Sequence, residues 1–288
     1  VSSELTTFQG RSEFLSVGSA IHRNGTDSGK LEFSTSADGQ ELYCQLDAGF
    51  TPLRFVFGNV AFSIGVGGGI VGALKSMAKG EIKEYSDIFN KTRHLALRRI
   101  SEEAKACGAN SVVGIETRAM LWAGVHEMLM MGTASRHPLL NAPKTADDIV
   151  TSDLTNEEMW NLIHLGYMPV KLVLGTAVYS LGIVGGIKAM FRSLTRGEIP
   201  ELTSIVYEAR EHAIGMIRDE ANAINADDVV GIRTYIHEHN GLLEFMAIGT
   251  AVRKMQGLTT VSDSLPPQAI IKDKSTWKAE VALHQPGH

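Results

Sequence analysis

Two short stretches of the chain decide its fold: Val-Val-Gly-Ile at 112–115 returns at 229–232, and Gly-Thr-Ala at 132–134 returns at 249–251. Both recurrences are 117 residues apart, and at that offset residues 49–134 align with 166–251 without a gap. In this alignment 32 of the 86 pairs are identical. A solenoid repeats every ~20–50 residues, so this period is far too long for one. The sequence therefore predicts a tandem duplication of a whole small domain.

Each copy predicts the same α+β unit, an antiparallel sheet with one long amphipathic helix. A capping box, Asp38-x-x-Glu41 in the first copy and Thr155-x-x-Glu158 in the second, indicates where the short first helix begins. Apolar residues at i, i+3, i+4 and i+7 give the long helix one buried face. In the first copy we expect a strand at 31–35, a short helix ending at Gly49, a strand at 53–62, a long helix at 81–107, and strands at 111–121 and 125–134. In the second copy we expect the same elements in the same order: a strand at 149–152, a short helix ending at Gly166, a strand at 170–179, a long helix at 198–224, and strands at 228–237 and 242–252.

The repeat also defines what lies outside it. We expect an N-terminal extension at 1–30, repeats at 31–136 and 148–256 joined by a linker at 137–147, and a tail at 257–288. Both ends are rich in Gly, Ser, Pro or His, a composition typical of mobile extensions.

The composition limits the partners and the compartment. The chain has 288 residues, with 27 Lys and Arg against 32 Asp and Glu, a net charge of −5. This balance argues against a nucleic-acid partner, because such binding depends on clustered cations that neutralise phosphates. Its two cysteines exclude a disulfide framework and indicate a reducing, cytoplasmic compartment. The first thirty residues show no basic region followed by an apolar run, so we expect no signal peptide.

Several shorter motifs recur in the same order in both copies. A Gly-Glu pair precedes the long helix, Ala209 and Arg210 lie within it, the Val-Val-Gly-Ile block follows, and Gly-Thr-Ala-Val ends the second copy at 249–252. In this order the motifs resemble the YbjQ-type heavy-metal-binding domain family, as a tandem-repeat member. The first copy departs from the pattern at Thr92 and Ser135. The resemblance implies a small α+β unit that assembles into a five-membered ring, and it implies no established activity.

A ring also suits so small a domain. About 100 residues bury only a modest core, and exposed strand edges need a partner. Closed cyclic assembly pairs those edges and covers apolar surface. We therefore expect a homo-oligomer, a pentamer in which each chain gives one repeat to each of two stacked rings. In the alternative arrangement both repeats of a chain lie in one ring, which then holds an even number of repeats.

One histidine pair is a candidate metal site. His237 and His239 flank Glu238 at the end of a predicted strand, so their side chains share one face of the sheet. Two imidazoles on one face suit a divalent transition metal such as zinc, copper or nickel, with further ligands from a neighbour. Positions 120–122 of the first copy hold Met, Leu and Trp instead. The alternative is that these histidines are solvated residues at the end of a strand.

The glycine-rich segment allows three interpretations. Residues 67–72 satisfy G-x-G-x-x-G, but the second copy loses this motif while keeping the fold, which argues against a dinucleotide site. The uncharged run from Phe55 to Leu74 is long enough to span a membrane, whereas its counterpart carries Lys188 and is preceded by Lys171. Membrane-surface association therefore stays an alternative. We favour close backbone packing at a subunit contact for the glycines that both copies share, Gly65, Gly68, Gly69, Gly182, Gly185 and Gly186.

Two pairs of charges occur at equivalent positions, Arg93 with Arg210 and Glu127 with Glu244. We interpret the arginines as structural, joining the long helix to a sheet or to the next subunit through one of these carboxylates. The alternative is an enzyme or small-molecule carrier with sites at subunit interfaces, in which arginine clamps an anion and glutamate is a general base. The copies share no cysteine or histidine, so we expect no duplicated active site and favour a non-enzymatic, ring-forming scaffold or metal-holding protein.

Overall fold

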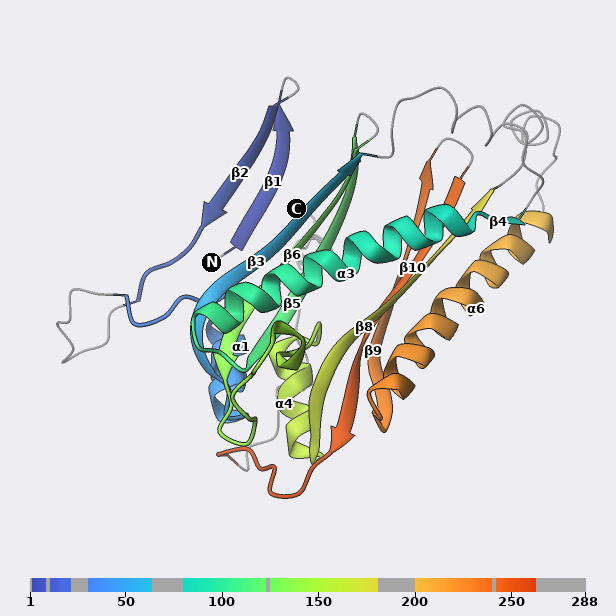
Figure 1. Ribbon diagram of the computed structural model, residues 1–288. Helices are drawn as coiled ribbons and strands as arrows, with labels where there is room; N and C mark the ends of the chain where they lie inside the picture. Colours follow the sequence, from blue (N-terminus) through green and yellow to red (C-terminus); the bar gives the residue numbers. More distant parts are fainter. Residues whose placement is uncertain are drawn as a thin grey trace, which may run out of the picture.

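The computed structural model describes residues 2–8, 11–21, 31–63, 80–122, 125–180, 200–239 and 242–262. In these residues the fold is α+β, with four α-helices, two four-stranded sheets and a separate hairpin (Figure 1). The predicted fold class is therefore confirmed.

The two repeats contain matching elements. Repeat 1 holds α1 (Gly39–Asp47), β3 (Thr51–Ser63), β4 (Gly80–Glu81), α3 (Lys83–Ala106), β5 (Ser111–Trp122) and β6 (Val125–Arg136). After a 3₁₀ turn, η1 (Ala146–Asp148), repeat 2 holds β7 (Val150–Thr151), α4 (Asn156–His164), β8 (Tyr167–Ser180), α6 (Pro200–Ala223), β9 (Asp228–His239) and β10 (Leu242–Lys254).

Both short helices begin and end as the sequence predicts. The Asp38 carboxylate accepts hydrogen bonds from the N–H groups of Gln40 and Glu41, at 2.9 and 2.8 Å, and the Glu41 side chain reaches back to the Asp38 N–H. The capping box of Thr155 repeats this arrangement at α4. Gly49 and Gly166 follow the helices with φ of +86° and +83°, a region that favours glycine.

The repeats exchange strands. One sheet has the order β3-β6-β5-β7 and the other β4-β8-β10-β9. Strand β7 comes from repeat 2 but pairs in parallel with β5 of repeat 1, and β4 comes from repeat 1 but pairs with β8 of repeat 2. Each sheet is therefore completed by a strand of the other repeat.

The strand predicted at 31–35 does not form. Its counterpart β7 joins the sheet of repeat 1 through β5, whereas residues 31–35 pair with no strand among the described residues. The segment still holds an equivalent place: Ser34 Oγ accepts a hydrogen bond from the Phe55 N–H at 2.9 Å, as Thr151 Oγ1 does from the Leu172 N–H.

Both ends of the chain are more structured than their composition predicts. Strands β1 (Ser2–Phe8) and β2 (Arg11–Val17) form a hairpin of their own, with Leu5 opposite Phe14. At the other end the Val261 N–H donates to the Asp47 carbonyl at 3.0 Å, which fixes the start of the tail on α1.

The two repeats share a core. Helices α1 and α4 pack together, and one apolar cluster contains Cys44 and Phe50 of repeat 1 with Trp160 and Met168 of repeat 2. The Trp160 Nε1–H donates to the Asp47 carboxylate at 2.7 Å across this contact. Separating the repeats would expose this apolar surface, so the chain folds as one body.

The long helices lie on their sheets at very short range. A Cβ atom added at Gly58 in β3 would lie 2.2 Å from the Ala96 carbonyl oxygen in α3, and one at Gly175 in β8 would lie 2.2 Å from that of Ala213 in α6. Only glycine fits where a strand backbone meets a helix backbone in this way. Within the described residues, no helix is long and apolar enough to cross a membrane.

This close approach gives a prediction. Gly58→Ala forces α3 away from β3, and we expect it to lower the free energy of unfolding by about 2–4 kcal/mol. Gly215→Ala in α6 is the control, because its new methyl group meets no atom within 4 Å. That control should raise the stability by about 0.5–1 kcal/mol through helix propensity. Urea denaturation measures both, and equal effects at the two glycines would contradict the close packing.

Candidate functional site

The most distinctive polar site joins the repeats. Arg93 of α3 is fully buried and reaches out of its own repeat. Its Nη1 donates to the Thr176 hydroxyl in β8, and its Nη2 donates to the Glu244 carboxylate in β10. Glu244 is itself only 1% exposed. We call the contact of α3 with β8 and β10 the repeat joint.

Other side chains of α3 complete the repeat joint by bonding the edge of β8. The amide of Asn90 accepts from the Thr176 N–H and donates to the Thr176 carbonyl, both at 2.9 Å. The Ser86 hydroxyl accepts from the Val178 N–H at 3.0 Å. These side chains satisfy backbone groups that a neighbouring strand would otherwise take, so the edge is closed by a helix.

The electrostatics make the buried pair interdependent. Burial lowers the pKa of Arg93 to about 9, which still leaves the guanidinium charged at neutral pH. Phe89 adds a ring whose centroid lies 5.7 Å from the guanidinium carbon. A buried charge is costly without its partner, so Arg93 and Glu244 each need the other to remain in the core.

The equivalent residues elsewhere in the chain are kept apart. In repeat 1, Asn59 and Glu127 take the places of Thr176 and Glu244; the Asn59 amide donates to the Glu127 carboxylate at 2.7 Å. Glu127 is 7% exposed. Arg210, the equivalent of Arg93, lies on the exposed side of α6, where it bonds Glu211 at 2.6 Å.

This geometry bears on the enzyme alternative. Arg93 and Glu244 lie inside the protein with their charges turned toward each other, so a substrate has no access to them. A general base or an anion clamp needs hydrogen-bonding reach to a bound molecule. Their chemistry is that of a structural joint.

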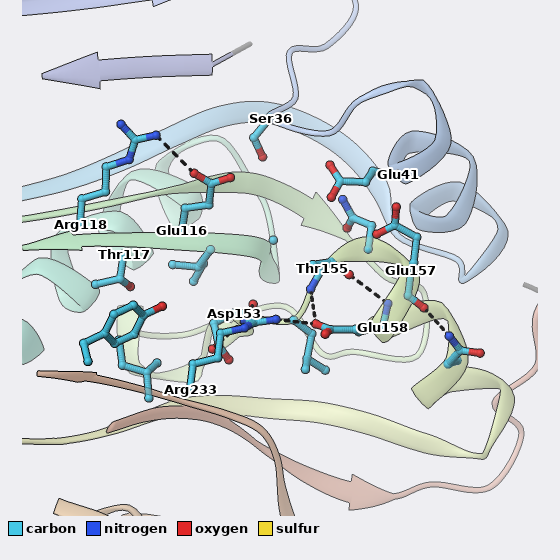
Figure 2. Close-up of a pocket in the computed structure, with 17 residues that line it drawn as sticks. Ser36, Glu41, Glu116, Thr117, Arg118, Asp153, Thr155, Glu157, Glu158 and Arg233 are labelled. Atoms are coloured by element: carbon cyan, nitrogen blue, oxygen red, sulfur yellow. Dashed lines mark hydrogen bonds and ion pairs between the residues drawn. The ribbon is translucent and has the colours of Figure 1, made fainter. Parts of the chain in front are cut away.

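A separate pocket of about 640 Å³ opens between the repeats (Figure 2). Residues 114–118 of β5 and Glu41 form one wall, and residues 153–158 with Arg233 form the other. Arg233 donates to the Asp153 carbonyl and to the Glu158 carboxylate, both at 2.7 Å. The pocket is thus lined by both apolar and charged side chains, and the two arginines pair with acidic side chains of the same lining.

The inner wall of the pocket holds the segment that enters α4. Asp153 is 7% exposed and accepts from the Thr250 hydroxyl at 2.6 Å. Burial is the largest influence on its pKa and raises it, against the opposing effects of Thr250 and Arg233. Arg233 and Asp153 were missing from the sequence-based candidates, because the first copy has Glu116 and Ser36 in their places and the comparison of copies selects only shared residues.

The described residues of one chain do not fit a metal ion. No group of three or more His, Cys, Asp or Glu side chains gathers in the ranges that the structure covers. His237 lies on β9 opposite Glu244 of β10, and His239 ends the same strand. Within one chain the pair would supply two of the four ligands that a structural zinc site requires, so a site there would need ligands from a neighbour.

The remaining predicted residues play no part in a described site. Burial raises the pKa of the Cys44 thiol to about 11, so it is unreactive, and Cys107 is also free. The shared glycines at 65, 68, 69, 182, 185 and 186 lie outside the described residues. Phe55 to Ser63, the start of the uncharged run, belongs to strand β3.

Comparison with known proteins now settles the family. The sequence profile of the YbjQ family, described as "Putative heavy-metal-binding", matches residues 50–137 and again 167–255, which is more than half of the chain. The chain belongs to the YbjQ family. It is a tandem-repeat member, because each match covers one repeat.

Its relatives fall into two kinds. The chain is 27% identical over 228 residues to the Encapsulin nanocompartment protein Rv1762c of Mycobacterium tuberculosis, across 75% of this chain and 84% of that protein. Proteins named UPF0145 from Methanoregula boonei and Thermotoga maritima are 41% and 39% identical over 83 residues. Those matches cover 28% of this YbjQ-family chain and 69% and 78% of the relatives.

The repeat joint gives a prediction about stability. Arg93→Met leaves Glu244 buried without its cation, and we expect a loss of about 3–5 kcal/mol in the free energy of unfolding. The double variant Arg93→Met/Glu244→Met removes both charges and should recover most of this loss. Arg98→Met is the control: Arg98 is 63% exposed in its pair with Glu102, so its effect should stay within about 0.5 kcal/mol. Additive losses in the double variant, measured in urea, would contradict the pairing.

Proposed function

We propose that this protein is a non-enzymatic building block that assembles with copies of itself into a closed ring and serves as a scaffold. The observation that carries the proposal is the repeat joint. Together with the other contacts between the repeats, it resembles a subunit interface: strands are exchanged, an apolar core is shared and an arginine–glutamate pair is buried. A protein that joins two copies of one domain in this way has surfaces suited to joining further copies.

The named relatives support a role in assembly. The Mycobacterium tuberculosis protein is named for an encapsulin nanocompartment, and its match extends over most of both chains. The words of that name describe an assembly, a nanocompartment, and name no reaction. We carry over to this chain only the assembly role.

The contact between the repeats favours one arrangement of the ring. Repeat 1 and repeat 2 lie side by side and meet through unlike surfaces, the helix of one against the sheet of the other (Figure 1). Contacts of this heterologous kind propagate from unit to unit and close into a ring when the rotation allows. We therefore propose that both repeats of a chain lie in the same layer, in place of the two stacked layers expected from the sequence.

The size of the particle tests this proposal. Native mass spectrometry and light scattering after gel filtration should give one closed assembly with a fixed number of whole chains at micromolar concentration. A closed ring leaves no free joining surface, so the mass should not grow as concentration rises. A single chain across this range, or a mass that increases without limit, would contradict the proposed ring.

The proposal gives no structural role to a metal held by one chain. Protein prepared without a metal-affinity column should carry less than one equivalent of zinc, copper or nickel per chain by elemental analysis. The variant His237→Ala/His239→Ala should have the same metal content and the same assembly state. A stoichiometric metal that the double variant loses would contradict this prediction and would make the histidine pair a ligand set.

A further inference from the structure

We propose that Arg210 of one chain enters the Asn59–Glu127 site of the next chain, so that the contact which joins the repeats is used again between chains. This inference rests on the proposed self-assembly and names its partner surface, a second copy of this chain. The site of repeat 1 is then incomplete until the neighbour supplies its arginine.

The acceptor side is a buried anion that pairs with no cation among the described residues. Glu127 is only 7% exposed, and the Asn59 side-chain amide donates a hydrogen bond to its carboxylate. In the described part of the chain no Lys, Arg or His side chain pairs with it. The equivalent Glu244 receives the Arg93 guanidinium, and a buried carboxylate is greatly stabilised by such a partner.

Beside this carboxylate, the edge of β3 also has backbone N–H groups without an acceptor among the described residues. On β8 four successive outward N–H groups are bonded: Leu172 by Thr151, Leu174 by Glu220, Thr176 by Asn90 and Val178 by Ser86. On β3 the first two have the same kind of acceptor, Ser34 for Phe55 and Glu103 for Phe57. Among the described residues no acceptor serves the next two, the N–H groups of Asn59 and Ala61. These are the positions that α3 closes on β8.

The donor side is the N-terminal half of α6. Arg210 is the counterpart of Arg93, and Thr203 brings a hydroxyl where α3 uses that of Ser86. Leu202 and Val206 stand in the places of Tyr85 and Phe89 and are only half-buried. Opposite them, β3 leaves Phe57 45% exposed and Phe62 38% exposed. The contact would therefore pair Arg210 with Glu127 and give the Thr203 hydroxyl to the Ala61 N–H, which has no acceptor among the described residues. It would also cover apolar surface on both α6 and β3.

A second contact of the repeat joint, between Asn90 and Met216, would be replaced between chains by a different but also favourable pair. In the repeat joint Asn90 of α3 lies 3.4 Å from the Met216 sulfur of α6. The repeat places Tyr207 and Arg99 at this contact between chains. Tyr207 is 56% exposed, and Arg99 already bonds the Asn59 carbonyl at the proposed site. An arginine beside a tyrosine ring is a favourable contact.

The other end of the same interface is equally open. In the chain β7 covers the edge of β5, whereas its counterpart, residues 33–34, joins no strand in the part of the chain that the structure describes. The equivalent edge belongs to β9, where Ile232 and Ile236 are 44% and 53% exposed. Pairing residues 33–34 with β9 of a neighbour puts repeat 2 of one chain beside repeat 1 of the next. The arginine site requires the same arrangement, so two independent features point to one contact.

The contact between chains is weaker than the one inside the chain. His94 of α3 pairs with Glu220 of α6 at 2.8 Å, whereas the repeat places Glu211 and Glu103 at this position between chains. Two like charges oppose each other there. Arg210 must also leave Glu211 when it binds. Single substitutions at the arginine site should therefore be enough to prevent assembly.

Two single variants test the inference by native mass spectrometry and gel filtration. Arg210→Glu removes the cation from the donor side, α6, and leaves the acceptor site at Glu127 intact. Glu127→Gln removes the charge of the acceptor site and leaves Arg210 on α6 intact. We expect each variant alone to weaken association by about 100-fold or more. An equimolar mixture should form a 1:1 pair of chains and stop there, because only Arg210 of the Glu127→Gln chain finds an intact Glu127. Formation of the pair also shows that both variants are folded.

Glu208→Lys is the matched control, a charge reversal two positions from Arg210. Its counterpart Lys91 remains exposed beside the repeat joint, so the control should assemble like the wild type. Wild-type assembly that persists in Arg210→Glu, or a mixture that forms no 1:1 pair, would overturn the inference while leaving self-assembly in place. A wild-type protein that stays a single chain would overturn the proposed function itself.

Discussion

The packing of α3 against the sheet of repeat 2, where Arg93 and Glu244 are paired, is the contact on which the rest of the structure depends. The pair draws the long helix of repeat 1 onto the sheet of repeat 2, and the charges hold each other inside a core that would exclude either alone. With α3 in this position, β4, which precedes it, pairs with the edge of β8. The chain after α3 forms β5 and β6 in the sheet of repeat 1, and β7 then pairs with β5. The strand exchange and the shared core therefore depend on the placement of one helix.

Duplication explains why such a chain is poised to assemble. Each repeat has a long helix, packed on its own sheet, whose outer side can also close the edge strand of the next repeat. Within the chain α3 closes the edge of β8 in this way, and we propose that α6 closes β3 between chains through Arg210 and Glu127. Chains joined through this contact would continue to add further chains unless the last one meets the first and closes a ring. A closed ring leaves no strand edge exposed for unwanted pairing.

The self-alignment of the sequence carried much of the prediction. The capping boxes, the positive-φ residues and the long amphipathic helices could be read locally, because each depends on a few neighbouring residues. The strand at 31–35 could not, because its existence depends on a partner that lies outside the repeat. The repeat aligns Gly58 with Gly175, but their contacts with Ala96 and Ala213 are seen only when strand and helix are packed. The pocket around Arg233 was missed because the copies differ there.

The central claim is that the contact within the chain is also the contact between chains. Electron cryo-microscopy of the assembled protein tests it most directly. The account predicts that α6 of one chain lies on β3 of the next as α3 lies on β8, with the Arg210 guanidinium hydrogen-bonded to Glu127 and residues 33–34 paired with β9. Stacked rings, each containing only one kind of repeat, or chains that meet through other surfaces, would contradict it.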